Sequence, residues 1–170
     1  MRYDSVGREI FDRKAKSSDF VNELEKFGDW FGCVPDTIFK KVLPELEKWF
    51  LAPRENHLIG MAFGARLAMK KPVVLIQNSG LGLSLDAILG TFGLYNRGLL
   101  MIVSNRGILD WEEVQHKDWG DITESLLSAS NISMIDFNEE GIDGIQKAAE
   151  IAFVKQRVVA LIIQRGNLDE

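Results

Sequence analysis

The fold of this chain is decided by a strand that leads directly into a polar, glycine-containing segment, Lys71-Pro72-Val73-Val74-Leu75-Ile76-Gln77-Asn78-Ser79-Gly80-Leu81-Gly82. The residues from Val73 to Ile76 show no polar alternation, which is typical of a parallel strand covered on both faces. An amide, a hydroxyl and two glycines then follow, and ligands bind at the carboxyl ends of such strands. The sequence therefore predicts a parallel sheet with a site at the end of this strand.

The segment just before it predicts a helix with an acid at its start, Arg54-Glu55-Asn56-His57-Leu58-Ile59-Gly60-Met61-Ala62-Phe63-Gly64-Ala65, running on to about residue 69. Pro53 suits a helix start, and the helix dipole favours an acid in the first turn. Gly60, Gly64 and Ala68 recur every four residues and leave one helix face nearly bare, so another backbone or a ring can approach closely. Glu55 is therefore either an ordinary first-turn acid or part of a site.

The rest of the chain alternates between expected strands and helices. Further strands are expected at 30–34, 50–52, 99–103, 132–135 and 158–163. Helices are expected at 20–27 after a cap at 17–19, at 35–49 with Pro44 inside it, and at 83–94, 122–130 and 141–156. A polar loop of seventeen residues, 104–120, is long enough to favour a functional role. Residues 1–15 predict a charged N-terminal arm, and 16–170 predict one α/β domain of three αβα layers with a mainly parallel sheet.

Composition excludes several classes of protein. With 46% apolar and 26% charged residues the chain is neither disordered nor fibrous, and its net charge of -5 disfavours a nucleic-acid partner. One cysteine and two histidines leave neither an internal disulfide nor a zinc site, so we expect no metal held by this chain. Since no apolar run reaches the length of a membrane span and no signal peptide is recognisable, we expect a cytoplasmic location without a membrane partner.

Three polar clusters follow expected strands and should converge at one edge of the sheet: Glu55, then the run from Gln77 to Gly80, then Ser104-Asn105-Arg106-Gly107. A dinucleotide site is a competing interpretation, because a strand, glycines and a helix are present. The third glycine of that fingerprint is replaced by Leu85, however, and no phosphate-binding Gly-Lys-Ser or Gly-Lys-Thr occurs. An NAD-linked reductase is therefore the less favoured alternative.

Several motifs together carry a family resemblance: Cys33-Val34-Pro35-Asp36, Arg54-Glu55-Asn56, the glycine- and alanine-rich helix, Gln77-Asn78-Ser79-Gly80-Leu81-Gly82, Asn105-Arg106-Gly107 and Gln115-His116-Lys117. Over residues 15–165 the chain resembles the pyrimidine-binding domain of thiamine-diphosphate enzymes. The likeness is greatest to the alpha subunits of the sulfopyruvate and phosphonopyruvate decarboxylase group.

This resemblance implies a role for each candidate site residue. Glu55 would be catalytic, hydrogen-bonding a ring nitrogen of the cofactor's aminopyrimidine and so activating thiamine diphosphate for attack on a 2-oxo acid. His116 would be the second catalytic residue, as a proton donor or substrate anchor. The other implied contacts are Gln77, Asn78, Ser79 and Gly80 for the cofactor, and Arg106, Gln115 and Lys117, with His116, for an anionic substrate.

Each of these roles has a plainer alternative. The run from Gln77 to Gly80 could be a strand-to-helix turn in which Asn78 and Ser79 only cap the next helix. His116 could be an inert loop histidine, and Arg106 and Lys117 could be solvated loop charges.

The sequence departs from the family pattern on the substrate side. Leu83 and Asp86 stand where the family commonly has asparagines, Val114 stands where a proline often precedes the Gln-His pair, and Asn105 stands where a tryptophan is usual. Cofactor use is compatible with these changes, but the 2-oxo acid is not identified. Carboligation, acyl transfer and a non-catalytic binding domain of the same fold therefore remain open alternatives.

The family's diphosphate- and metal-binding motif, Gly-Asp-Gly with a later Asn, does not occur in this sequence. By the resemblance, a separate beta subunit would hold the diphosphate and Mg²⁺ in a hetero-oligomer. The bare helix face of Gly60, Gly64 and Ala68 is the candidate contact with that partner.

Overall fold

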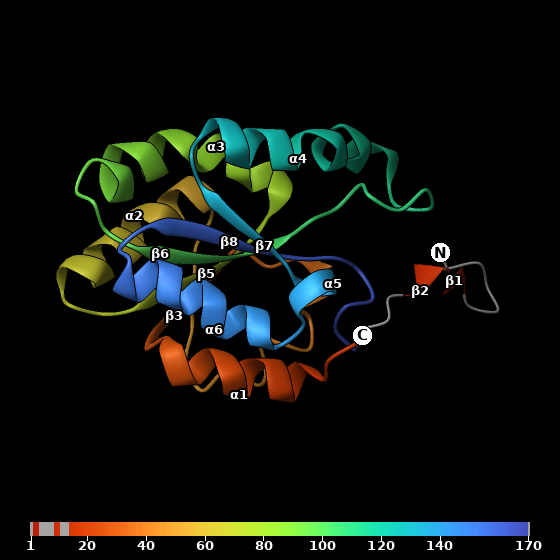
Figure 1. The fold of residues 1–170 in the computed structure, drawn as a ribbon, viewed down its shortest axis with the longest axis horizontal. Coiled ribbons are helices and arrows are strands. Elements are labelled where there is room, and N and C mark those ends of the chain that lie inside the picture. The colour runs from red at the N-terminus through yellow and green to blue at the C-terminus, as the bar shows by residue number, and fades with distance from the viewer. Residues whose placement is uncertain (1, 4–8, 11–13, 170) are drawn as a thin grey trace.

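A six-stranded parallel sheet forms the centre of the computed structural model, which describes residues 2–3, 9–10 and 14–169 (Figure 1). The strand order is β4-β3-β5-β6-β8-β7, and every pair in this sheet is parallel. The strands are β3 (Trp30–Cys33), β4 (Phe50–Leu51), β5 (Pro72–Gln77), β6 (Leu99–Ser104), β7 (Ser133–Asp136) and β8 (Val158–Ile163). The predicted parallel sheet is confirmed.

Helices cover both faces of the sheet. In Figure 1, α1 (Ser17–Phe27) and α6 (Asp143–Ala149) lie on one side, and α2 (Glu55–Leu67), α3 (Asn78–Ile88) and α4 (Lys117–Ala129) lie on the other. Two π-helical turns, Leu89–Gly93 and Glu150–Val154, continue α3 and α6, while α5 (Phe137–Glu140) is a single turn after β7. The predicted three-layer αβα arrangement is thereby confirmed.

The central strands are buried on both faces, which explains why they lack polar alternation. In β6, Leu100 and Ile102 join the core under α1 and α6, while Met101 and Val103 join the core under α2 and α3. Burying one such side chain contributes about 1.5–3 kcal/mol. The sheet is thus a rigid base for the loops at its carboxyl edge.

The helix predicted over 35–49 is wrong. The structure has a short 3-10 helix, Thr37–Phe39, followed by turns. Lys40 N donates to Thr37 O at 3.2 Å and Glu45 N to Val42 O at 3.1 Å, so these bonds join residues three apart instead of four. Pro44 has no N–H to continue a helix, and the apolar spacing reflects burial of Val42 and Leu46 in turns.

Two predicted helix starts were placed too late. The helix predicted from residue 83 begins at Asn78, and the one predicted from 122 begins at Lys117, which shortens the predicted loop of 104–120. A 3-10 turn, Val114–His116, occupies its end. The predicted helix over 141–156 is α6 with its π-helical continuation.

Glycines that suggested a turn instead lie inside α3, where they allow close packing. A methyl group at Gly82 would come within 2.8 Å of the Trp119 ring. One at Gly80 would collide with the carboxylate of Glu55.

The predicted arm, residues 1–15, falls largely outside the described residues. Within it, β1 (Arg2–Tyr3) pairs with β2 (Glu9–Ile10) as an antiparallel ladder. Ala15 N donates to Asn167 O at 2.9 Å, which ties this part of the chain to the C-terminal segment. The division between an arm and a domain at residue 16 stays a prediction.

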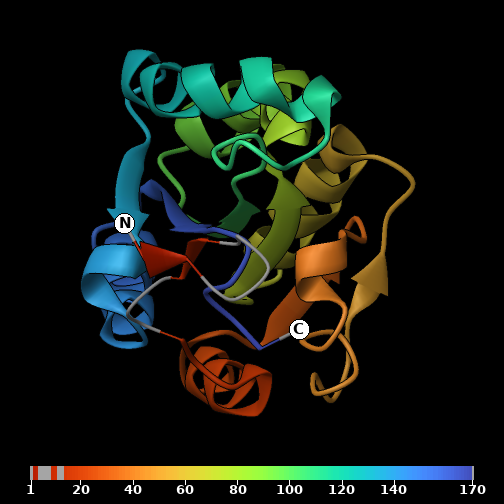
Figure 2. The same cartoon turned by 90° about the vertical axis from the view of Figure 1, so that its right-hand side faces the viewer.

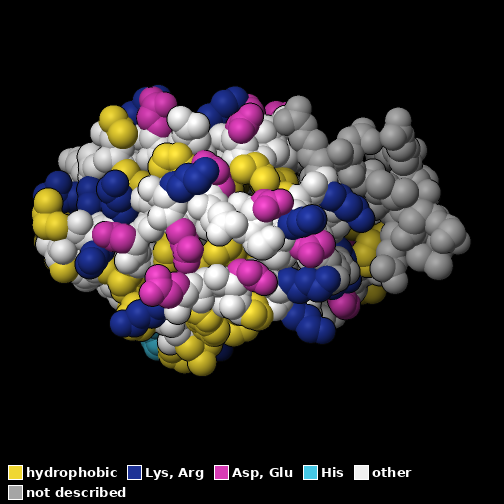
Figure 3. Space-filling view, turned by 90° about the horizontal axis from the view of Figure 1, so that it is seen from below, with side chains coloured by type: hydrophobic (Ala, Val, Ile, Leu, Met, Phe, Trp, Pro, Cys, Tyr) yellow, Lys and Arg dark blue, Asp and Glu magenta, His cyan; other side chains and the backbone are white. Residues whose placement is uncertain are grey.

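The surface over α1 and α6 carries charges of both signs. Lysine and arginine side chains alternate there with aspartate and glutamate, and apolar side chains gather toward one margin of the view (Figure 3). Among the described residues, no helix combines the length and apolar character needed to cross a bilayer.

Candidate active site

Glu55 begins α2 and lies against Gly80 of α3. Figure 2 looks onto the side of the molecule that carries the loop after β6, with the helical layers above and below the sheet. A methyl group at Gly80 would collide with the Cγ, Cδ and Oε1 atoms of Glu55, so glycine is what lets the carboxylate lie over the start of α3. Within the part of the chain that the structure describes, this partly buried carboxylate has no hydrogen-bond or ion-pair partner. Glu55 therefore stays a candidate for a ligand contact.

Gln77 and His116 are joined by a hydrogen bond. Gln77 ends β5 and His116 immediately precedes α4, and Gln77 Nε2 lies 3.0 Å from His116 Nδ1. In the imidazole tautomer with its hydrogen on Nε2, Nδ1 accepts from Gln77. The other ring nitrogen, Nε2, lies 3.9 Å from Glu113 Oε2, and the imidazole side chain is 15% exposed. The structure thus brings together two residues that are 39 positions apart in sequence.

Asn78 is held inside the protein by hydrogen bonds to neighbouring segments. It is fully buried, and its Nδ2 lies within 3.0 Å of Asn105 Oδ1, the Arg106 carbonyl oxygen and Thr123 Oγ1. Its Oδ1 accepts from Arg106 N at 3.3 Å. Because both ends of the amide are engaged inside the chain, this geometry does not favour the predicted cofactor contact.

Arg106 is buried among carboxylates. Its side chain is 4% exposed, and Nε donates to Glu112 Oε1 at 2.7 Å. Nη1 donates to Asp36 Oδ2 at 3.2 Å and Nη2 to Glu113 Oε2 at 2.7 Å. Burial alone lowers the pKa of Arg106, but the Glu112 hydrogen bond and the three carboxylates outweigh burial and raise it. Since every guanidinium nitrogen has a partner, the predicted role as a substrate anchor is not favoured.

Three other predicted site residues keep their side chains available. Ser79 is partly buried in the first turn of α3, while Gln115 and Lys117 are exposed beside His116. None of these three side chains has a hydrogen-bond or ion-pair partner among the residues that the structure describes. They remain candidates for ligand contacts.

The carboxylates around Arg106 were not predicted as part of the site. Asp36 follows β3, and its Oδ1 also accepts from Ile38 N at 2.8 Å. Glu112 Oε2 accepts from Gly107 N at 2.7 Å. The signal in the sequence was an acidic pair, Glu112-Glu113, near an arginine in one loop, which can be recognised only if the loop is expected to fold on itself.

Cys33 lies at the end of β3 near this cluster. Burial, and then the nearby charges of Asp36 and Glu55, raise the pKa of its thiol to about 12. The thiol is therefore protonated and unreactive at neutral pH.

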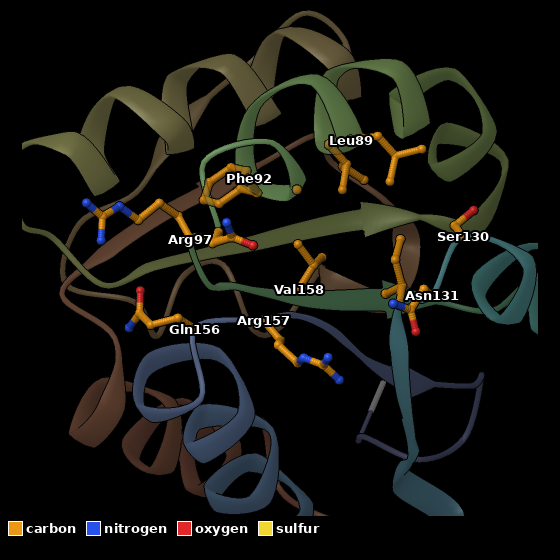
Figure 4. Close-up of a pocket in the computed structure, with 12 residues that line it drawn as sticks. Leu89, Phe92, Arg97, Ser130, Asn131, Gln156, Arg157 and Val158 are labelled. Carbon is orange, nitrogen blue, oxygen red and sulfur yellow. The ribbon is translucent and has the colours of Figure 1, made fainter.

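A separate hollow of about 310 Å³ lies where the strands begin, at the opposite edge of the sheet (Figure 4). Leu89, Phe92 and Val158 contribute apolar lining. The side chains of Arg97 and Arg157 extend away from each other in Figure 4, so the hollow does not present converging charges to a ligand. Because ligands of parallel sheets bind at carboxyl ends, the Glu55 edge is the candidate active site.

The described residues contain no group of three or more His, Cys, Asp or Glu side chains that could hold a metal ion.

Comparison with curated proteins finds the same family that the motifs indicated, although no protein-family model matches the chain. Sulfopyruvate decarboxylase subunit alpha from Methanococcus maripaludis is 32% identical over 147 residues, which are 82% of this chain and 88% of that protein. The protein of the same name from Methanocaldococcus jannaschii is 37% identical over 81 residues, 48% of each chain. The resemblance is confirmed.

Solved structures share the fold at low sequence identity. Benzoylformate decarboxylase from Polynucleobacter necessarius has a TM-score of 0.71 and 15% identity, covering 91% of this chain and 31% of that one. The 2-oxoglutarate:ferredoxin oxidoreductase from Magnetococcus marinus has a TM-score of 0.68 and 16% identity, covering 90% of this chain and 29% of that one. The present chain thus spans about a third of the length of these two proteins, and the likeness concerns the fold. On the extent of its match to the Methanococcus maripaludis protein, the chain belongs to the sulfopyruvate decarboxylase alpha-subunit family.

Proposed function

We propose that this chain is the alpha subunit of a two-subunit, thiamine-diphosphate-dependent decarboxylase that acts on an anionic 3-substituted pyruvate, such as sulfopyruvate or phosphonopyruvate. The observation that carries the proposal is the Glu55 carboxylate, which lies on Gly80 without a partner among the described residues. Because Glu55 is only partly buried, its carboxylate stays open to contact with a ligand. Family membership supplies the class of ligand.

The residues around Glu55 fit an aminopyrimidine ring. The carboxyl group can share a proton with a ring nitrogen, and Gly80 lets that carboxylate lie over the start of α3. When bound, thiamine diphosphate supplies the electron sink that decarboxylation of a 2-oxo acid needs. Glu55 would polarise the bound ring, and Gln77 and Ser79 would border it at the same edge of the sheet.

His116 is the proposed proton carrier. Gln77 holds its Nδ1 at 3.0 Å, which fixes the ring and directs Nε2 toward the loop side. A histidine can both give and take a proton near neutral pH. In this proposal His116 would deliver a proton to the substrate carbon that loses carbon dioxide.

Lys117 and Gln115 are the proposed contacts for the anionic tail of the substrate. Lys117 is the exposed first residue of α4, and the N-terminal end of a helix also favours an anion. The curated relatives are named for sulfopyruvate, which supports a sulfonate or a similar tetrahedral anion. We assign Arg106 to the support of this site instead.

A beta subunit is the proposed source of the diphosphate and Mg²⁺ site. The outer faces of α2 and α3 carry exposed apolar side chains, among them Met61, Leu67 and Leu83. Gly60 and Gly64 have nothing within 4 Å of an added methyl group, so a partner can approach the helix backbone there. The proposed assembly is a hetero-oligomer with the cofactor between the subunits.

The test is carbon dioxide release by the complex of this chain with its beta subunit, offered sulfopyruvate, phosphonopyruvate and pyruvate. Glu55→Gln keeps the size of the side chain but cannot share the proton, so turnover is expected to fall by at least about 100-fold. Asp19→Asn is the matched control, because Asp19 is the first-turn acid of α1. It should change turnover less than twofold. Wild-type turnover in Glu55→Gln would contradict the proposal.

A further inference from the structure

Arg106 and its carboxylate partners join three segments that are distant in sequence. Nη1 donates to Thr37 Oγ1 at 3.1 Å and to Asp36 at 3.2 Å, which ties the end of β6 to the segment after β3. Nε and Nη2 donate at 2.7 Å to Glu112 and Glu113 in the loop before His116. One guanidinium therefore connects the sheet with the loop that carries the proposed proton carrier.

The same loop folds tightly around Glu112. Its Oε1 bonds Arg106, while its Oε2 accepts from Gly107 N at 2.7 Å and faces Leu109 N at 3.5 Å. The side chain of Glu112 is 1% exposed, so its charge depends on Arg106 for compensation. Without the arginine, the buried Glu112 carboxylate, which accepts from the loop backbone, would lose its ion pair.

Two glycines bring His116 against the start of this loop. Gly107 has a φ of +86°, and a methyl group there would collide with the His116 carbonyl. A methyl group at Gly120, in the first turns of α4, would likewise collide with the Gly107 carbonyl. The position of His116 is thus set by contact with residue 107, which directly follows Arg106.

We infer that Arg106 is a positioning residue, which fixes the loop of 107–116 and so holds His116 against Gln77 in the geometry required for proton transfer. The expected effect on turnover rests on the proposed function. The effect of Arg106 on the order of the loop of 107–116 does not depend on that function. The inference assigns to Arg106 a role different from the substrate contact that its charge suggested. The substrate's anionic tail is left to Lys117, whose side chain has no partner among the described residues.

Arg106→Lys tests the inference because it keeps the charge but loses the fork that reaches three carboxylates. In the intact chain, amide hydrogen exchange over residues 109–117 is expected to become at least about tenfold faster. In the complex with the beta subunit, kcat should fall by about ten- to a hundredfold for sulfopyruvate and pyruvate alike, because misplacing a catalytic group slows every substrate. Arg97→Lys, at the opposite edge of the sheet, is the matched control and should leave both measurements unchanged.

Glu113→Gln provides a milder second variant, since the Glu113 side chain is 51% exposed and its loss leaves no buried charge unpaired. Its exchange over 109–117 should rise by less than that of Arg106→Lys but above the wild-type rate. Unchanged exchange in both variants would overturn the inference. So would a change confined to KM for the sulfonate substrate, because that pattern belongs to a substrate anchor. Failure of the Glu55→Gln test would leave the exchange result intact, so the two proposals fail separately.

Discussion

The Glu55 carboxylate occupies the space that a side chain at residue 80 would fill. Glu55 begins α2 and Gly80 lies in the first turn of α3, so two neighbouring helices meet at this point. A glycine inside a helix costs about 1 kcal/mol relative to alanine. Its presence here is explained by the carboxylate that it accommodates.

Gly80→Ala should separate activity from stability. The added methyl group pushes aside the flexible end of Glu55, while alanine favours the helix, so the unfolding free energy should change by less than about 1 kcal/mol. Turnover of the complex should fall at least about tenfold because the carboxylate is displaced. Urea unfolding and carbon dioxide release measure the two effects. Gly90→Ala is the control, since a methyl group there meets nothing within 4 Å, and full activity in Gly80→Ala would refute the packing argument.

Cys33 gives a pH-dependent prediction. Its thiol pKa is raised by burial to about 12 from an ordinary value of 9.0, so the folded state favours the protonated thiol. This contribution to stability is fully present below about pH 9 and is lost as the pH rises toward 12. At pH 8, iodoacetamide should alkylate the native chain about a thousandfold more slowly than the unfolded chain. Because the chain has one cysteine, mass spectrometry reports the site directly, and equal rates would show that the thiol is accessible.

At the scale of elements, the strands and the start of α2 were predictable, whereas the starts of α3 and α4 were not. Runs such as Val73 to Ile76 and Val158 to Ile163 are apolar throughout, and burial on both faces of a parallel sheet demands that pattern. The start of α3 was missed because Gly80 and Gly82 disfavour helix locally. Their reason, contact with Glu55 and Trp119, lies in tertiary structure.

In the segment from Thr37 to Trp49, a helix was predicted where the structure has a short 3-10 helix and turns. Its apolar spacing suits a helix, but Pro44 removes a donor, and turns bury Val42 and Leu46 instead.

The candidate site, like the secondary structure, was predictable only in part. Motif positions indicated Glu55, Gln77 and His116, and the last two do meet in the structure. The engagement of Arg106 by Asp36, Glu112 and Glu113 was not predictable, because local sequence does not show that a loop folds back on its own arginine.

The outer face of α2 gives a prediction about assembly. Gly64→Ala should stabilise the isolated chain by about 0.5–1 kcal/mol, because the new methyl group meets nothing within 4 Å in this chain. If the beta subunit packs on this face, the same methyl group should weaken the complex at least about tenfold. Urea unfolding of the chain and titration with the beta subunit measure the two effects. Unchanged affinity would place the interface elsewhere.

At the scale of the whole molecule, the candidate active site lies at one edge of the sheet. The sheet brings Glu55, Gln77 and His116 to that edge, while the described residues contain no group suited to a metal ion. The central proposal is that the chain holds the part of the site that activates thiamine diphosphate and that a second subunit supplies the rest.

Calorimetric titration of thiamine diphosphate with Mg²⁺ tests this claim most directly. The titration is made into the chain alone, into the beta subunit alone, and into their mixture. The account predicts at least about tenfold tighter binding in the mixture than in either subunit, and a loss of that gain with Glu55→Gln. Equal binding with and without this chain, or tight binding to this chain alone, would contradict a site shared between two subunits.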